Sequence, residues 1–452
     1  MLLAIEKLIY GGDGLARLPA DERGRGKAVF LPFVLGGEKV EAAVVEEKPG
    51  FARARAESIV EASQHRVTPD CPYFGRCGGC HYQHARYEHQ LEIKKEILRE
   101  NLRRIAKLEL STEIQVHASP PWNYRNRTRL QIETQPEFAL GYFKLSSHEL
   151  LPVEQCPISS PLINRAIAAL WRTGRAGKAA GVREVEFFAN AEDTQLLAEF
   201  SCSLDAHPHD VRAWAEALCA SMPGITGVVA FRKAKPGAGP GTRNEPVVAV
   251  GAAELIYATQ QAPYRVSADA FFQTNRHLIE ELVNVVAQGQ SGGLALDLYA
   301  GVGLFSTALA CNFHHIVAVE SSHPAAADLV YNAPRNVKAV PATVEHYLAE
   351  RCGLGRPERS ASRKSALPKT EFDRERPDLV VVDPPRSGLG ERVSGYLVSL
   401  GAPGVTYVSC DPATLARDLV SLLAAGYRLE QAHLVDLFPQ TYHLETVLRL
   451  VR

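Results

Sequence analysis

Cys410 ends a stretch of sequence that predicts a buried strand followed by a helix. Residues 405–410 form a candidate strand, Asp411 and Pro412 interrupt that pattern, and leucines then recur at helical spacing. The thiol is therefore expected at the carboxyl end of a strand, which is where open α/β sheets bind ligands. A free cysteine is more often a small buried core residue, so its neighbours must decide between the two roles.

Two glycines follow another candidate strand, residues 294–300. Gly301 and Gly303 let the backbone approach a ligand closely, whereas a dinucleotide site would have a third glycine at Ser306. Glu320 ends the next candidate strand, where a carboxylate can accept hydrogen bonds from ribose hydroxyls. These features favour an adenosyl ligand that lacks a pyrophosphate.

Two more groups of polar residues follow strand-like runs near the C-terminus. Asp383 precedes two prolines that stiffen the loop beyond it, and it comes directly after an apolar run. The last loop of the chain offers His443 and Glu445 as acid or base candidates. For either residue alone, a surface or capping role is the default.

Four cysteines form the second pattern that can do chemistry: Cys71, Cys77, Cys80 and Cys156. The first three have the spacing C-x5-C-x2-C, which suits an iron–sulfur cluster. The alternative is zinc, with His81 or His84 as a possible ligand. Neither the paired C-x2-C of zinc modules nor the C-x3-C-x2-C of radical enzymes is present.

Composition limits the protein class. A chain of 452 residues predicts about two to four domains, and 50 basic against 51 acidic residues exclude a global field that attracts polyanions. No run of about 18 apolar residues and no export signal are present, so we expect a cytoplasmic protein without a membrane segment. Nine cysteines in such a chain argue against a disulfide framework.

The chain divides into three predicted domains. Short strands separated by glycine turns over residues 1–61 fit a five-stranded OB-like barrel. Residues 62–265 alternate strands and helices, and they begin with the cysteines and an amphipathic helix over 88–108. Residues 266–452 alternate apolar strands with helices, which predicts a doubly wound sheet that ends in an edge hairpin. The fold class is therefore multidomain α/β.

A row of arginines after the amphipathic helix is the best local signal for nucleic acid. Arg125, Arg127 and Arg129 would share one face of a strand, beside Trp122 and Tyr124. The alternative is a solvated strand face without a partner. Two segments, 232–246 and 354–376, are expected to be a turn-rich loop and an insertion without chemistry.

The sequence resembles the RNA uracil-5 methyltransferases over nearly its whole length. The barrel resembles a TRAM domain, and the four cysteines match a cluster site of that family. The other motifs that carry the similarity are Ala270-Phe-Phe-Gln-Thr-Asn275, Asp297-Leu-Tyr-Ala-Gly-Val-Gly303, Asp383-Pro-Pro-Arg-Ser-Gly388, Ser409-Cys-Asp-Pro412 and Phe438-Pro-Gln-Thr-Tyr-His-Leu-Glu445. Asp411 and Leu304 depart from the family, since many members have Asn at the first position and some have Asn at the second.

The resemblance implies a central α+β domain with a [4Fe–4S] cluster and a C-terminal Rossmann-like methyltransferase domain. It implies that the cluster binds Cys71, Cys77, Cys80 and Cys156. It also implies that S-adenosylmethionine is held by Gln273, Tyr299, Glu320 and Asp383. Cys410 is then the nucleophile that adds to carbon 6 of uracil, and Glu445 is the base that removes the proton from carbon 5. We expect the helix after Cys410 to lower the pKa of its thiol.

The implied substrate is a uridine in RNA, with 23S rRNA favoured because a TRAM barrel together with a cluster site is typical of the ribosomal enzymes. The alternatives are the T-loop uridine of tRNA, or a non-catalytic iron–sulfur protein that binds RNA or senses redox state. We expect the protein to act as a monomer.

Overall fold

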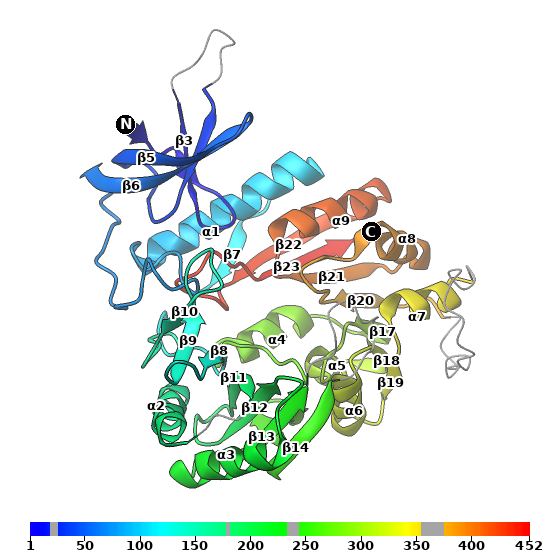
Figure 1. The fold of residues 1–452 in the computed structure, drawn as a ribbon. Coiled ribbons are helices and arrows are strands. Elements are labelled where there is room, and N and C mark those ends of the chain that lie inside the picture. Colours follow the sequence, from blue (N-terminus) through cyan, green and yellow to red (C-terminus); the bar gives the residue numbers. More distant parts are fainter. Residues whose placement is uncertain (19–25, 178–180, 233–243, 354–374) are drawn as a thin grey trace.

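The computed structural model describes residues 1–18, 26–177, 181–232, 244–353 and 375–452. Three sheets form most of the molecule, and Figure 1 shows the first as a separate unit beside the N-terminus. Most of the predicted loop 232–246 and of the predicted insertion 354–376 lies outside the described residues.

The N-terminal unit is a six-stranded sheet, one strand more than predicted. Its strands are β1 (Leu2–Ala4), β2 (Lys7–Leu8), β3 (Gly14–Arg17), β4 (Ala28–Leu31), β5 (Lys39–Glu47) and β6 (Phe51–Glu61), in the order β1-β5-β6-β4-β3-β2. They enclose a small apolar core that includes Val29, Leu31 and Val40. The two-residue strand β2 is too short to predict from alternation.

Helix α1 (Tyr87–Asn101) continues as one turn of π-helix, η1 (Leu102–Ala106), which agrees closely with the predicted helix over 88–108. Its apolar face, with Ile93, Ile97 and Leu98, packs into the same core as the C-terminal sheet. Figure 1 shows α1 between the barrel and that sheet. The helix therefore joins the two units.

The central unit is a seven-stranded sheet in the order β10-β9-β8-β11-β12-β13-β14. Its strands are β8 (Arg127–Glu133), β9 (Ala139–Phe143), β10 (Leu150–Pro152), β11 (Val182–Ala189), β12 (Leu196–Cys202), β13 (Ile225–Arg232) and β14 (Glu245–Gly251). Helices α2 (Pro161–Ala176) and α3 (Pro208–Ser221) pack against it, and the hairpin β15 (Glu254–Ala258) and β16 (Pro263–Ser267) follows.

The C-terminal unit has an eight-stranded sheet in the order β19-β18-β17-β20-β21-β23-β22-β7. Its strands are β7 (Ile114–His117), β17 (Gly292–Leu298), β18 (Phe313–Glu320), β19 (Val337–Pro341), β20 (Leu379–Val382), β21 (Gly404–Ser409), β22 (Arg428–Val435) and β23 (Thr446–Val451). The helices that connect them are α4 (Ile279–Ala287), α5 (Leu304–Leu309), α6 (His323–Asn332), α7 (Val344–Arg351), α8 (Gly390–Leu400) and α9 (Pro412–Ala424). The predicted βα alternation is therefore present.

The prediction that the last hairpin forms the edge of this sheet is wrong. Strand β7, which lies in the predicted central domain, pairs in parallel with β22 and covers that edge. The domain boundaries at 62–265 and 266–452 stay a prediction. Helix α1 and strand β7 belong to the predicted central domain by sequence, but they pack with the C-terminal sheet. Among the described residues, no helix is both long and apolar enough to cross a lipid bilayer.

Candidate active site

Cys410 and Glu445 meet at one edge of the C-terminal sheet. Strands β17, β18, β20 and β21 are parallel, so their carboxyl ends share this edge. Strand β23 runs antiparallel to β21, and its first residue, Thr446, pairs with Ser409, the last residue of β21. The residues just outside this pair are Cys410 and Glu445. The register of two strands thus places the predicted nucleophile beside the predicted base.

Two aspartates extend this group of acidic residues. Asp383 follows β20, and Gln273 Nε2 lies 3.5 Å from its Oδ2. Asp297 is fully buried in β17, where one carboxylate oxygen accepts a hydrogen bond from Ser306 and the other has no partner. Burial raises the pKa of Asp297 to about 6, and burial with the charge of Asp297 raises that of Asp383 to about 7.

The prediction that the Cys410 thiol has a lowered pKa is wrong for the protein without ligands. Burial raises this pKa to about 12, and the negative charges of Glu445 and Asp383 add to the effect. Burial and Asp383 in turn raise the pKa of Glu445 well above its usual value. The nearby guanidinium of Arg386 acts in the opposite direction on Cys410.

Asp411 explains why the following helix does not help the thiol. Its carboxylate accepts hydrogen bonds from the backbone amides of Ala413 and Thr414, at 3.0 and 2.9 Å, and so caps the N-terminus of α9. The backbone amides that could stabilise a Cys410 thiolate are therefore already bonded to the carboxylate of Asp411.

The remaining predicted cofactor residues lie at the neighbouring strand ends. Tyr299 follows β17 with a positive φ of 66°, a strained conformation for a non-glycine residue. Glu320 ends β18 and accepts hydrogen bonds from the backbone amides of Gly301 and Ser322, at 2.9 and 2.5 Å. Gly303 has a φ of 96°, and a Cβ there would lie 2.8 Å from Leu329. Position 303 of this loop therefore requires glycine.

Arg386 and Tyr10, which the sequence did not single out, complete the surroundings of Cys410 together with His443. Arg386 donates from Nη2 to His443 Nδ1 at 2.6 Å, and burial with nearby cations lowers the pKa of His443 to about 3. His443 is thus a neutral acceptor rather than a base. Tyr10 of the barrel donates its hydroxyl to the Cys410 carbonyl at 3.3 Å and packs on Tyr442 at 5.5 Å between ring centroids.

Nothing in the local sequence pointed to Tyr10, which lies 400 positions before Cys410. Arg386 could have been predicted from the sequence, because it belongs to the motif that begins at Asp383.

The four predicted cluster cysteines line one cavity of about 220 Å³. Arg125 and Tyr142 line it too, and Gln83 accepts a hydrogen bond from the Cys71 amide at 3.3 Å. Burial and neighbouring thiols raise the pKa of Cys77 to about 11. A bound cationic centre would offset this cost of forming thiolates, so the donor set fits an iron–sulfur cluster.

The zinc alternative requires ligands that converge on one point. Within the described ranges, no three His, Cys, Asp or Glu side chains are arranged to hold a metal ion, and this includes the four cysteines. His84 Nε2 lies 3.2 Å from the Val34 carbonyl, and His81 packs on Tyr442 at 4.6 Å between ring centroids. Neither histidine is among the residues that line the cysteine cavity.

The predicted arginine ridge is wrong. Arg127 is buried, with ion pairs to Glu186 at 2.9 Å and Glu199 at 3.2 Å, while Arg129 pairs with Glu186 at 2.7 Å. Arg125 faces the cysteine cavity instead. Arg127 and Arg129 neutralise carboxylates of other strands of the sheet, and Arg125 lines the cavity, so the three do not form a free basic surface.

Comparison with known proteins identifies the family. The model of the tRNA (uracil-5-)-methyltransferase family matches residues 249–452, and the TRAM domain model matches residues 1–56. A 23S rRNA (uracil(1939)-C(5))-methyltransferase, RlmD, from Halomonas elongata is 31% identical over 459 residues, which cover 99% of this chain and 89% of the relative. The chain belongs to the RNA uracil-5 methyltransferase family. The predicted enzyme class and TRAM domain are thereby confirmed.

Two other proteins are similar to this uracil-5 methyltransferase over almost its whole length. An uncharacterized RNA methyltransferase from Aquifex aeolicus is 33% identical over 452 residues, which cover 98% of this chain and 97% of the relative. The crystal structure of the Pyrococcus abyssi tRNA (uracil-54, C5)-methyltransferase with S-adenosyl-L-homocysteine shares the fold. It has a TM-score of 0.71 and 23% identity, and each chain is fully covered.

The capping role of Asp411 predicts the effect of Asp411→Asn in this methyltransferase. Asn also caps helices well, so the free energy of unfolding should change by less than about 0.5 kcal/mol. Loss of the negative charge should lower the pKa of Cys410 and raise its alkylation rate at pH 8 about two- to five-fold. Iodoacetamide labelling of the Cys410 peptide, followed by mass spectrometry, measures this rate. An unchanged or slower rate would contradict the electrostatic role.

Proposed function

We propose that this enzyme transfers the methyl group of S-adenosylmethionine to carbon 5 of a uridine in RNA, with Cys410 as nucleophile and Glu445 as base. The observation that supports it most is the Ser409–Thr446 pair, which brings the thiol and the carboxyl to one point of the sheet edge. Carbon 5 of uracil is a weak nucleophile, so it needs activation before it can accept a methyl group.

The chain supplies that activation in three steps. The Cys410 thiolate adds to carbon 6, and the electrons of the carbon 5–carbon 6 double bond move into the ring as an enolate. Carbon 5 then accepts the methyl group. Glu445 removes the proton from carbon 5, the bond between carbon 6 and sulfur breaks, and the double bond re-forms. The thiolate leaves with the electron pair, so the enzyme is regenerated.

We assign the cofactor to Gln273, Tyr299, Glu320 and Asp383. When bound, S-adenosylmethionine supplies an electrophilic methyl group on a positively charged sulfur. The carboxyl groups of Asp297 and Asp383, one with an unpartnered buried oxygen, suit a ligand that carries positive charge and hydroxyl donors. Glu320 retains lone pairs for ribose hydroxyls although it accepts two backbone amides.

We assign a [4Fe–4S] cluster to Cys71, Cys77, Cys80 and Cys156. Their shared cavity and the all-thiol donor set support this assignment.

For the substrate, we propose 23S rRNA, with the relative at 31% identity as the support. The T-loop of tRNA is the second candidate, because the names of the family model and of the Pyrococcus protein both give tRNA as the substrate. In either RNA the uridine must leave its stack to expose carbons 5 and 6, so an unpaired region is the expected target.

Two variants separate the two catalytic roles. Cys410→Ala should abolish methyl transfer, because carbon 5 is then not activated. Glu445→Gln should lower kcat about 10²- to 10⁴-fold and accumulate a methylated covalent complex with unmodified RNA, because proton removal is blocked after methyl transfer. Gel shift under denaturing conditions detects that complex. Methylation by Cys410→Ala at the wild-type rate would refute the role of the thiol.

The cluster assignment predicts a defined metal content. Protein purified without oxygen should carry four iron and four sulfide ions per chain, the composition of a [4Fe–4S] cluster, and absorb visible light. Cys80→Ser should lose this absorbance, whereas Cys219→Ser, at a half-buried position of α3 outside the cysteine cavity, should keep it. One zinc ion per chain in place of iron would show that the assignment is wrong.

The substrate assignment predicts where 5-methyluridine forms. Unmodified transcripts of 23S rRNA and of tRNA are incubated with the enzyme and S-adenosylmethionine, then digested and analysed by mass spectrometry. The rRNA should be methylated with a kcat/KM at least about ten-fold above that of tRNA, a difference of about 1.4 kcal/mol. The reverse preference would transfer the assignment to tRNA, and methylation of neither would favour a non-catalytic RNA-binding role.

A further inference from the structure

The segment that carries Glu445 forms no helix or strand, and its two ends are tied to the sheet by the hydrogen bonds from the Asp436 amide to the His117 carbonyl and from the Val435 amide to the Glu445 carbonyl, both at 2.9 Å. Residues 436–445 connect β22 to β23, and we call them the base segment. Most of its residues are buried, including Asp436, Gln440 and Glu445. A buried segment without a strand or helix must obtain its hydrogen bonds from its neighbours, so those neighbours determine its conformation.

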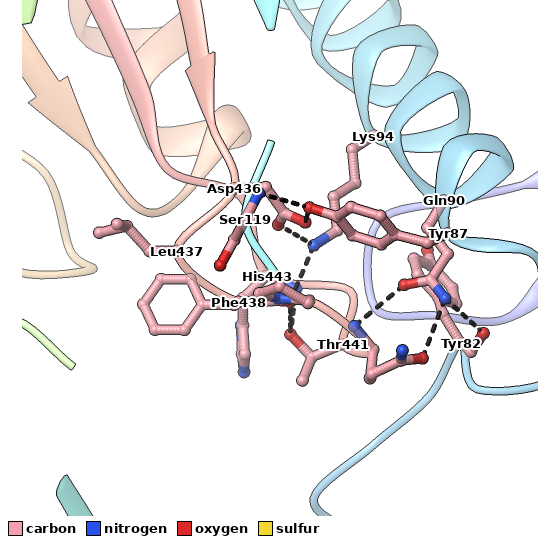
Figure 2. Close-up of polar contacts among 12 residues, drawn as sticks. Tyr82, Tyr87, Gln90, Lys94, Ser119, Asp436, Leu437, Phe438, Thr441 and His443 are labelled. Atoms are coloured by element: carbon pink, nitrogen blue, oxygen red, sulfur yellow. Dashed lines mark hydrogen bonds and ion pairs between the residues drawn. The ribbon is translucent and has the colours of Figure 1, made fainter. Parts of the chain in front are cut away.

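Lys94 of helix α1 holds the start of the base segment. Its side chain is fully buried, and its Nζ lies 2.6 Å from Asp436 Oδ1 and 2.9 Å from the Phe438 carbonyl (Figure 2). Tyr87 donates its hydroxyl to the other oxygen of Asp436 at 2.9 Å, and it accepts a hydrogen bond from the Ser119 amide. Two charges and two backbone groups are thus satisfied in one buried cluster.

Gln90 holds the middle of the same segment. Its side-chain amide donates to Gln440 Oε1 and accepts from the Gln440 backbone amide, both at 2.9 Å. The Gln440 carbonyl accepts from the amides of His81 and Tyr82, which follow Cys80, the third of the four predicted cluster cysteines. Tyr87, Gln90 and Lys94 are spaced i, i+3 and i+7 along α1, so one face of the helix contacts the base segment.

A buried ion pair is a poor way to gain stability. The desolvation of two charges offsets most of their attraction, and apolar residues at such positions are often as stable or more stable. Burial lowers the pKa of Lys94, which shows the cost of placing a cation there. The pair instead fixes the conformation of the backbone, because Nζ makes short contacts with both Asp436 and the carbonyl of Phe438, two residues further on.

We infer that Lys94 is a positioning residue for methyl transfer, which fixes the base segment so that Glu445 faces Cys410. This inference rests on the proposed role of Glu445. It assigns α1, which lies far from Glu445 in sequence, a part in the alignment of the active site. A misplacement of the base by about 1 Å is enough to slow proton removal many-fold.

The test compares Lys94→Met with the double variant Lys94→Met/Asp436→Asn. The single variant leaves Asp436 buried without a cation, so both stability and activity should fall. The double variant removes both charges, so its melting temperature should recover while kcat stays at least about ten-fold below wild type with KM within about three-fold. Backbone amides of residues 436–445 should exchange hydrogen faster in both variants.

Arg66→Met is the matched control, because it removes the cation that pairs with another fully buried carboxylate, Glu38 of the barrel, at 2.6 Å. It should lower stability as Lys94→Met does, yet leave kcat of the folded protein and exchange in 436–445 unchanged. Recovery of wild-type kcat by the double variant, or unchanged exchange in the base segment, would overturn the inference.

The proposed function fails in a different way. If Glu445→Gln reacts as fast as wild type, Glu445 is not the base, whatever the exchange rates show. If Glu445→Gln is slow and the double variant is fast, the catalytic assignment stands and only the positioning role of Lys94 is lost.

Discussion

The register between β21 and β23 is the constraint on which the active site depends. A parallel strand ends, and an antiparallel strand begins, at the same edge of the sheet, so the Ser409–Thr446 pair brings Cys410 and Glu445 together. A shift of one residue would turn each side chain to the other face of the sheet. Strand β20, the parallel partner of β21, adds Asp383 at the same edge. Strand pairing therefore brings the reacting groups together, and the contacts of the connecting segments orient their side chains.

The electrostatics of this edge disfavour the thiolate form of Cys410. Burial raises the pKa values of Asp383, Cys410 and Glu445. Repulsion from neighbouring negative charges raises them further, because water does not screen these charges well at a buried site. Asp411 occupies the amides at the start of α9, so the helix does not compensate. A ligand with positive charge suits this arrangement, and the thiolate becomes easier to form when such charge is present.

Local sequence patterns predicted most of the C-terminal fold and little of what supports the site. Strands such as β18 and β21 were predicted to within a few residues, because buried parallel strands are continuous apolar runs. Strand β7 was missed as a sheet member, since four residues far from the other strands carry no pairing signal. Arg127 was misread, because its carboxylate partners lie on other strands. Tyr10 and Lys94 act on segments more than 300 positions away, and only folding brings them there.

The central claim is that the sulfur of Cys410 bonds to carbon 6 of the target uridine. The most direct measurement uses RNA with 5-fluorouridine at the target, because fluorine at carbon 5 cannot be removed as a proton and the adduct persists. After reaction with S-adenosylmethionine and digestion, tandem mass spectrometry should find a methylated fluorouridine on the peptide that contains Cys410. An adduct on another cysteine, or methylation of unmodified RNA without any adduct on the fluorinated RNA, would contradict the account.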